Sequence, residues 1–227
     1  VTGVQTCALP IYFASVTEAV NELKKEKFVI VSDFIPGTDK FATLHLSISD
    51  ATGDNAIFEY IGGKLVINHD RSYNVMTNSP TFTKQLDLNE YWRGIPGTIM
   101  LPGTNRAADR FVRASYYINA IRQTSDTRIA LAGVFSVIRN CSVPLGISTK
   151  DEPNISSTRW RTVSDQKNLV YYFEDVLTPN VLWMDLKKVD FSEKASVKKL
   201  SLEKHEIYAG DTLDSFKNAS PFKFQGL

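Results

Sequence analysis

Two polar segments of the chain carry residue types that could stabilise negative charge in a reaction. They are Met76-Thr77-Asn78-Ser79-Pro80-Thr81-Phe82 and Leu101-Pro102-Gly103-Thr104-Asn105-Arg106-Ala107-Ala108-Asp109-Arg110-Phe111. An asparagine amide can donate to a developing oxyanion, and an arginine can stabilise a thiolate. Spacing alone assigns no such role, because Asn-Ser-Pro is typical of a turn and an arginine one helical turn after Arg106 is typical of a helix surface. The two segments therefore offer charge-stabilising groups without a nucleophile.

Cysteine and histidine are sparse in this chain. Cys7 and Cys141 form no Cys-x-x-Cys motif, and His45, His69 and His205 form no His-x-x-x-His motif. The pattern predicts neither a disulfide framework nor a metal site, and no cofactor is expected. Cys141 is internal, so its amine is part of a peptide bond, and it is expected to be a small buried residue. The sequence also lacks a Gly-x-Ser-x-Gly elbow, a phosphate-binding loop and a Gly-x-Gly-x-x-Gly fingerprint.

The two segments and their flanks, from about Tyr12 to the end of the chain, resemble the choloylglycine hydrolase family, which includes bile salt hydrolases and penicillin V acylases. In that family a cysteine at the mature amino terminus attacks an amide, and its own α-amine serves as the base. The resemblance implies that Asn78 belongs to the oxyanion site and that Arg110 lies beside the nucleophile. The chain begins with Val1. We therefore expect residues 12–227 to be the carboxy-terminal portion of a single domain whose nucleophile is absent from this sequence.

Residues 1–11 fit neither the family nor the helix that follows them. They resemble translated sequencing-adapter sequence, and we predict a non-native or disordered leader. Removal of six residues would expose the amine of Cys7. The family, however, follows its cysteine with a strand and then an arginine and an aspartate, whereas Cys7 runs through Ala8-Leu9-Pro10 into a helix. Cys7 is therefore not expected to be the nucleophile.

Periodicity gives the elements that must position these groups. Apolar residues at helical spacing predict helices over 16–25, 107–121 and 128–138, the first with a capping box of Ser15 and Glu18 and the last capped by Ser125 or Asp126. In the second helix Phe111, Ala114, Ser115 and Ile118 are expected on one face. Runs of branched and aromatic residues predict strands over 28–31, 42–49, 56–61, 64–68, 160–163, 169–173 and 181–186. Gly62-Gly63 predicts a tight hairpin.

A block of strands, a block of helices and a second block of strands favour an α+β fold with antiparallel sheets. The family resemblance implies more than this pattern shows. It implies the αββα sandwich of N-terminal-nucleophile hydrolases, here incomplete because the amino-terminal part is missing.

Composition narrows the function classes. The chain has 227 residues, and its 26 basic and 25 acidic residues leave a net charge of +1, so neither a nucleic-acid footprint nor a membrane-binding patch is expected. The resemblance implies a hydrolase of linear amide bonds whose partner is a small molecule: an N-acyl compound, a conjugated bile salt or penicillin V. The alternative is a non-catalytic αβ binding or structural module that keeps the fold. The stretch over 86–100 is short, as in Gram-negative members of the family, and because such members are often exported a periplasmic parent is a further hypothesis. A homo-oligomeric parent is a separate hypothesis from the same resemblance.

Overall fold

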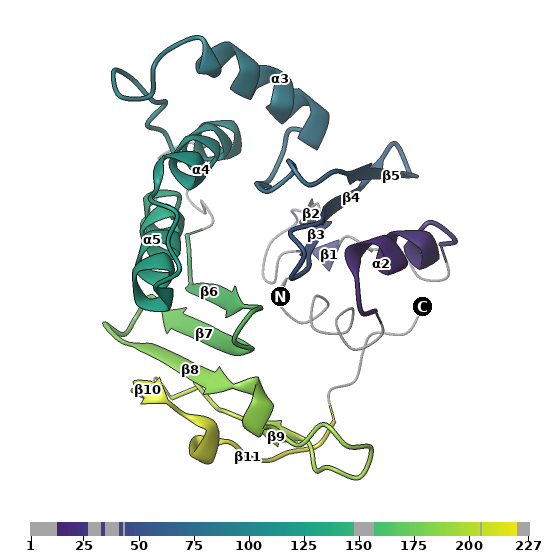
Figure 1. Ribbon diagram of the computed structural model, residues 1–227, viewed down its shortest axis with the longest axis vertical. Coiled ribbons are helices and arrows are strands. Elements are labelled where there is room, and N and C mark those ends of the chain that lie inside the picture. The colour runs from purple at the N-terminus through teal and green to yellow at the C-terminus, as the bar shows by residue number, and fades with distance from the viewer. Residues whose placement is uncertain are drawn as a thin grey trace. The chain divides into compact units, whose positions relative to one another are not determined.

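The computed structural model describes residues 13–26, 44–147, 157–204 and 206–221, together with the backbone of residues 33–34 and 41–42 (Figure 1). The chain divides into two compact units, Val1–Cys141 and Ser142–Leu227. The predicted leader, which includes Cys7, and the strand predicted over 28–31 lie outside the described residues.

A three-stranded antiparallel sheet forms the centre of the first unit. Its strands, in spatial order, are β3 (His45–Ser49), β4 (Asn55–Ile61) and β5 (Lys64–His69), and β1 (Asp33–Phe34) pairs separately with β2 (Phe41–Ala42). Between β4 and β5, Gly62 and Gly63 have φ values of 59° and 77°. Glycine adopts this region without steric cost, and the two-residue hairpin is confirmed. The strand predicted over 42–49 is confirmed over His45–Ser49, which is β3, whereas Ala42 belongs to the separate strand β2.

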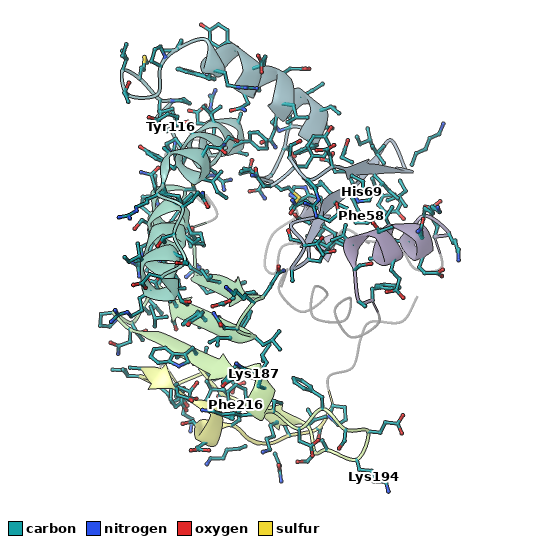
Figure 2. The ribbon with its side chains drawn as sticks, viewed as in Figure 1. Phe58, His69, Tyr116, Lys187, Lys194 and Phe216 are labelled. Atoms are coloured by element: carbon teal, nitrogen blue, oxygen red, sulfur yellow. The ribbon has the colours of Figure 1, made fainter. Side chains whose placement is uncertain are left out.

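Helix α2 (Val16–Leu23) covers one face of this sheet. Its buried residues Val16 and Leu23 pack against Ala56 and Phe58 of β4, and Figure 2 shows Phe58 where the strands meet α2. The Ser15 side chain accepts from the Glu18 N–H at 3.2 Å, as predicted. The reciprocal bond differs from a standard capping box, because the Glu18 carboxylate accepts from Ala14 N at 2.8 Å.

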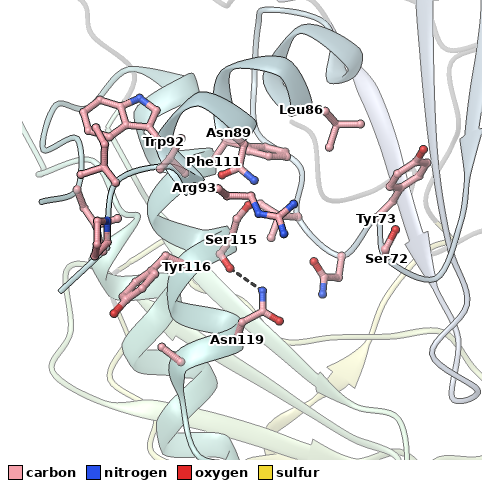
Figure 3. Close-up of a pocket in the computed structure, with 18 of the residues that line it drawn as sticks. Ser72, Tyr73, Leu86, Asn89, Trp92, Arg93, Phe111, Ser115, Tyr116 and Asn119 are labelled. Carbon is pink, nitrogen blue, oxygen red and sulfur yellow. Dashed lines mark hydrogen bonds between the residues drawn. The ribbon is translucent and has the colours of Figure 1, made fainter. Parts of the chain in front are cut away.

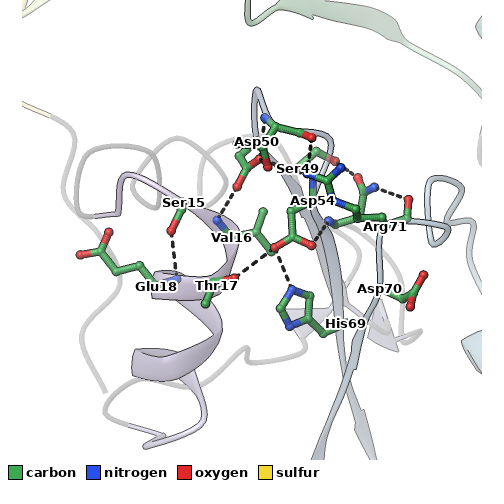
Figure 4. Close-up of polar contacts among 12 residues, drawn as sticks. Ser15, Val16, Thr17, Glu18, Ser49, Asp50, Asp54, His69, Asp70 and Arg71 are labelled. Atoms are coloured by element: carbon green, nitrogen blue, oxygen red, sulfur yellow. Dashed lines mark hydrogen bonds and ion pairs between the residues drawn. The ribbon is translucent and has the colours of Figure 1, made fainter.

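Polar contacts also anchor α2 to the β3–β4 turn (Figure 4). Asp50 Oδ2 accepts from the backbone N–H of Val16 at 2.9 Å. Asp54 Oδ2 lies 3.2 Å from Thr17 Oγ1 and 2.9 Å from His69 Nε2. These side chains tie the first turn of the helix to the sheet, and their carboxylates complement the positive end of the helix dipole.

Strand β4 is buried on both faces. Successive side chains of a strand point to opposite faces, and Ile57, between Ala56 and Phe58, packs against Phe82 and Phe111. The rings of Phe82 and Phe111 meet edge to face with centroids 6.0 Å apart. The sheet of this unit therefore has α2 on one face and two further helices on the other.

Those helices belong to the series α3 (Phe82–Arg93), α4 (Ala107–Ala120) and α5 (Thr127–Asn140), packed α3 on α4 and α4 on α5. The last two were predicted, and Asp126 is the cap of α5, accepting from the N–H groups of Arg128 and Ile129. Helix α3 was not predicted. The expected apolar face of α4 is only partly right, because its buried residues are Phe111, Val112 and Arg113, and Arg113 is held by a loop rather than by the core.

The second unit is built on strands β6 (Trp160–Asp165), β7 (Val170–Asp175) and β8 (Val181–Asp185), which pair antiparallel as predicted. The other elements are β9 (Lys198–Lys199), β10 (Gly210–Asp211), β11 (Lys217–Asn218), η2 (Leu186–Lys188) and η3 (Leu213–Ser215). Strand β10 pairs parallel with β8, so the expectation of purely antiparallel sheets is wrong for this edge. There, Thr212 donates to Trp183 O through its backbone N–H at 3.0 Å and its hydroxyl at 3.1 Å.

Helices and mainly antiparallel strands in separate blocks make this an α+β fold, as predicted. Lysine pairs 187–188 and 198–199 are solvent-exposed, and Figure 2 shows Lys187 and Lys194 on the second unit. None of the helices in the described ranges is long and apolar enough to cross a membrane.

Candidate active site

Asn78 and Arg110 are in direct contact although 32 positions separate them in the sequence. Arg110 Nη2 donates to Asn78 Oδ1 at 2.8 Å. Asn78 comes from the turn before α3, and Arg110 comes from the first turn of α4. The fold thus brings together the two side chains that the sequence resemblance selected.

This contact fixes the orientation of the Asn78 amide. An arginine can only donate, so the atom facing Arg110 must be the amide oxygen, and the Nδ2 group points elsewhere. Asn78 is exposed, and Nδ2 has no hydrogen-bond partner among the residues that the structure describes. The arrangement leaves an oriented N–H donor open to an incoming molecule.

Arg110 is half-buried and tied to its own loop. Its Nε donates to Asn105 O at 3.0 Å. Burial lowers the pKa of the guanidinium, and Arg113 lowers it further, while Cys141 acts in the opposite direction. An arginine pKa is normally so high that the group stays charged near neutral pH. Arg110 is therefore a fixed positive charge beside the Asn78 amide.

The loop before α4 is held by two further charged side chains of that helix, Asp109 and Arg113. Asp109 Oδ2 accepts from the Thr104 backbone N–H at 3.2 Å and from its hydroxyl at 2.5 Å. Arg113, which is 7% exposed, donates from Nη1 to Pro102 O at 2.7 Å and to Thr104 O at 2.9 Å. Asp109 and Arg113 thus shape the loop from which Arg110 is presented.

Cys141 lies near Arg110 but lacks the properties of a nucleophile of this type. Its Sγ is 3.6 Å from Arg110 O, and its backbone N–H is bonded to Val137 O and Ile138 O at the end of α5. Burial raises the pKa of its thiol, and Arg113 and Arg110 offset part of that rise. The side chain is half-buried rather than fully buried as expected.

The turn that carries Asn78 rests on two buried polar residues that sequence reasoning missed. Gln85 of α3 is 2% exposed and bonds to the backbone on both sides of Ser79. Glu59 of β4 is 8% exposed and accepts from Phe82 N through both carboxylate oxygens, at 3.1 and 3.0 Å. The sequence gives little sign that these two residues are buried, because a glutamine or glutamate inside a strand or helix is usually exposed.

A separate hollow of about 850 Å³ lies between α3, α4 and the segment after β5 (Figure 3). Helix α4 contributes Phe111, Val112, Ser115 and Tyr116 to its wall. Neither Asn78 nor Arg110 lines it. In the described part of the chain, no group of three or more His, Cys, Asp or Glu residues is arranged to hold a metal ion.

Comparisons of the sequence and of the structure with known proteins find the same kind of relative. The sequence model of linear amide C–N hydrolases, choloylglycine hydrolase family, matches residues 8–200. A penicillin V acylase from Pectobacterium atrosepticum is 51% identical over 95% of this chain. The solved penicillin V acylase from Agrobacterium tumefaciens is 58% identical, with a TM-score of 0.84 over 95% of this chain. A conjugated bile acid hydrolase from Clostridium perfringens is 25% identical, with a TM-score of 0.61 over 79% of this chain.

The chain spans less than two thirds of the length of each of these relatives: 61% of the Pectobacterium protein, 66% of the Agrobacterium structure and 60% of the Clostridium structure. The structural match confirms the fold type expected of N-terminal-nucleophile hydrolases. The chain belongs to the choloylglycine hydrolase family of linear amide C–N hydrolases.

Proposed function

We propose that the complete protein cleaves the amide bond of an N-acyl compound with an amino-terminal cysteine, and that Asn78 and Arg110 stabilise the charge formed in that reaction. The observation that carries the proposal is the Arg110–Asn78 hydrogen bond, which leaves the Asn78 Nδ2 donor exposed and oriented. Preorganised donors of this kind contribute strongly to acyl transfer, because they need no reorganisation as the oxyanion develops.

The proposed reaction has two steps. The cysteine thiolate attacks the carbonyl carbon, and Nδ2 of Asn78 donates to the oxygen as it becomes negative. The carbon–nitrogen bond then breaks, the α-ammonium group gives its proton to the leaving nitrogen, and an acyl thioester remains. Water, activated by the same amine, releases the acid and restores the thiol. An α-amine with an ordinary pKa of about 7.7 to 8.0 suits both proton transfers.

The nucleophile in this proposal is neither of the two cysteines in the sequence. Cys141 is internal, and its backbone N–H is engaged at the end of α5. Cys7 is followed by Ala-Leu-Pro and then by helix α2, not by the strand that the family places after its nucleophile. The proposal therefore assigns the nucleophile to a segment of the parent protein outside these 227 residues.

Penicillin V is the substrate that we propose. The two relatives at 51% and 58% identity are both penicillin V acylases, whereas the conjugated bile acid hydrolase is at 25%. The complete protein should release phenoxyacetate from penicillin V with a higher kcat/KM than it releases glycine or taurine from bile conjugates. Preference for the conjugates would overturn the substrate assignment, and no turnover of either would favour the non-catalytic module.

Asn78→Ala tests the catalytic assignment. Loss of one oxyanion donor lowers kcat by about 10²- to 10³-fold in comparable sites, and we expect a loss of that size in penicillin V hydrolysis. A matched control is Asn119→Ala, which removes an exposed asparagine of α4 whose side chain, among the described residues, bonds to Ser115 O of its own helix. An Asn78→Ala enzyme with unchanged kcat would remove the basis for this role.

A further inference from the structure

We infer that Gln85 is a positioning residue for the reaction: it holds the backbone of Asn78 so that the side-chain amide faces the substrate. This inference rests on the proposed function of Asn78. Gln85 lies in the first turn of α3 and has almost no contact with solvent, and its hydrogen bonds to described residues go to Thr77, Asn78 and Pro80. Its effect on catalysis would be transmitted through the turn that carries Asn78.

The contacts of Gln85 converge on the turn that carries Asn78. Its Nε2 donates to Asn78 O in a short hydrogen bond and to Pro80 O at 2.9 Å. Its Oε1 accepts from Thr77 Oγ1 at 2.6 Å. One buried amide thereby bonds to the residue before Asn78, to Asn78 itself and to the second residue after it.

The chemistry of these partners fixes the orientation of the Gln85 amide. Both groups that face Nε2 are backbone carbonyls, which can only accept, so the nitrogen and oxygen cannot be exchanged. A glutamine amide has two N–H donors and one carbonyl acceptor, and all are engaged. Fully satisfied buried polar groups of this kind specify one arrangement, because any displacement leaves a buried donor or acceptor unpaired.

Thr77 extends this arrangement to the helix that carries Arg110. Its Oγ1 lies 2.9 Å from Ala107 O, in the first turn of α4, and 2.6 Å from Gln85 Oε1. Asn78 is therefore held at its backbone by Gln85 and at its side-chain oxygen by Arg110. These two contacts orient the proposed oxyanion donor, Nδ2, which has no hydrogen-bond partner among the residues that the structure describes.

A double-mutant cycle in the complete protein separates positioning from general stability. Gln85→Met keeps the approximate length and volume of the side chain but removes its hydrogen bonds. We expect kcat to fall by about 10- to 100-fold with KM within about two-fold, because a small misplacement of a catalytic group is enough for such losses. In the Asn78→Ala background the backbone carbonyl held by Gln85 is still present but the donor is gone. There, Gln85→Met should change kcat by less than about two-fold.

Asn55 supplies a matched control elsewhere in the same unit. It is 7% exposed, its Nδ2 donates to Gly53 O and Arg71 O, and its Oδ1 accepts from Ser49 Oγ. Asn55→Leu therefore removes a buried amide with the same kinds of partner. It should lower the urea midpoint of unfolding as Gln85→Met does, but leave kcat unchanged. Effects of Gln85→Met and Asn78→Ala that multiply would overturn the inference.

Two further measurements keep the inference testable if Gln85→Met folds poorly or if the complete protein proves inactive. Thr77→Val should lower kcat while Thr77→Ser, which keeps the hydroxyl, should not. In the ¹⁵N-labelled 227-residue chain, the side-chain amide signal of Asn78, identified by its loss in Asn78→Ala, should shift in Gln85→Met and not in Asn55→Leu. An unshifted signal overturns the inference independently of turnover, whereas absent turnover with a shifted signal counts against the proposed function alone.

Discussion

The guanidinium of Arg110 makes two contacts that require a planar, forked cation. Its Nε reaches Asn105 O in the loop before α4, and its Nη2 reaches Asn78 Oδ1 in the turn before α3. Because the donors of a guanidinium have fixed relative directions, these bonds set both the distance and the orientation between loop and turn. A positive charge alone would not define the Asn78 amide in this way.

Arg110→Lys tests whether geometry or charge matters at this position. A lysine keeps the charge but offers one point donor, which cannot bond to both carbonyl groups with the same geometry. We expect kcat for penicillin V to fall by roughly 10-fold or more in the complete protein, a loss of the size expected for a misplaced catalytic group. Arg106→Lys, an exposed arginine one helical turn earlier, should change kcat little. Equal kcat values for the two variants would show that Arg110 contributes charge only.

The sequence selected the two candidate site residues but not the groups that support them. Asn78 and Arg110 were selected by resemblance to a family, since a turn asparagine and a helix arginine carry no local signal of catalysis. Their contact follows from the packing of α3 on α4, which no short motif encodes. Gln85 and Glu59 were missed because burial of a polar side chain depends on distant partners, and those partners become neighbours only in the folded chain.

Helix α3 was not predicted because its residues lack the local patterns from which a helix is recognised. Residues 82–93 lack a continuous apolar stripe, and only Phe82 and Gln85 are buried. The helix begins where the Phe82 N–H is capped by Glu59, 23 positions earlier in the sequence, while Thr81 gives no side-chain cap. The spacing of apolar residues cannot reveal a helix start that is fixed by a tertiary contact. Helices α4 and α5 were found because their apolar spacing is regular.

Helix α2 was predicted from its own residues, yet its attachment to the sheet depends on a carboxylate from the β3–β4 turn. Asp50 accepts from Val16 N through Oδ2, and from the backbone N–H and hydroxyl of Thr52 through Oδ1. The pKa of Asp50 is lowered to about 2. The hydrogen bond from the Thr52 hydroxyl is the largest cause, and the bond from the Val16 N–H is the next. These donors favour the ionised form, so ionised Asp50 supports the folded state.

The stability contributed by Asp50 should be lost in acid. Its pKa in the folded chain is below the ordinary value of 3.8, so the unfolded chain binds the proton more readily. The contribution is complete above about pH 4 and falls as the pH drops toward about 2. We expect the urea midpoint of the 227-residue chain to decrease over this window, and Asp50→Asn to reduce that decrease. Asp87→Asn, an exposed carboxylate of α3, is the control, and identical pH dependence in all three proteins would refute the link.

At the scale of the whole molecule, the groups proposed for catalysis all lie in the first compact unit, Val1–Cys141. The family match nevertheless runs through residue 200 and so includes strands β6, β7 and β8 of the second unit. In the proposed mechanism the chain supplies charge stabilisation, loop geometry and a fixed amide, and the attacking group belongs to another segment of the parent protein. Oxyanion donors accelerate a reaction only when a nucleophile has begun to create the charge that they stabilise.

The last prediction is that the 227-residue chain is inactive and that the complete protein is active. The 227-residue chain, incubated with penicillin V, should release no phenoxyacetate above the uncatalysed rate. Cys141 has neither a free amine nor an activated thiol, and Cys7 is followed by Ala-Leu-Pro and helix α2 rather than by the strand expected after the nucleophile. The protein expressed from the complete reading frame should be active, and mutation of its amino-terminal cysteine to alanine should abolish that activity. Turnover by the 227-residue chain that disappears in Cys7→Ala, with Cys141→Ala unaffected, would instead identify Cys7 as the nucleophile.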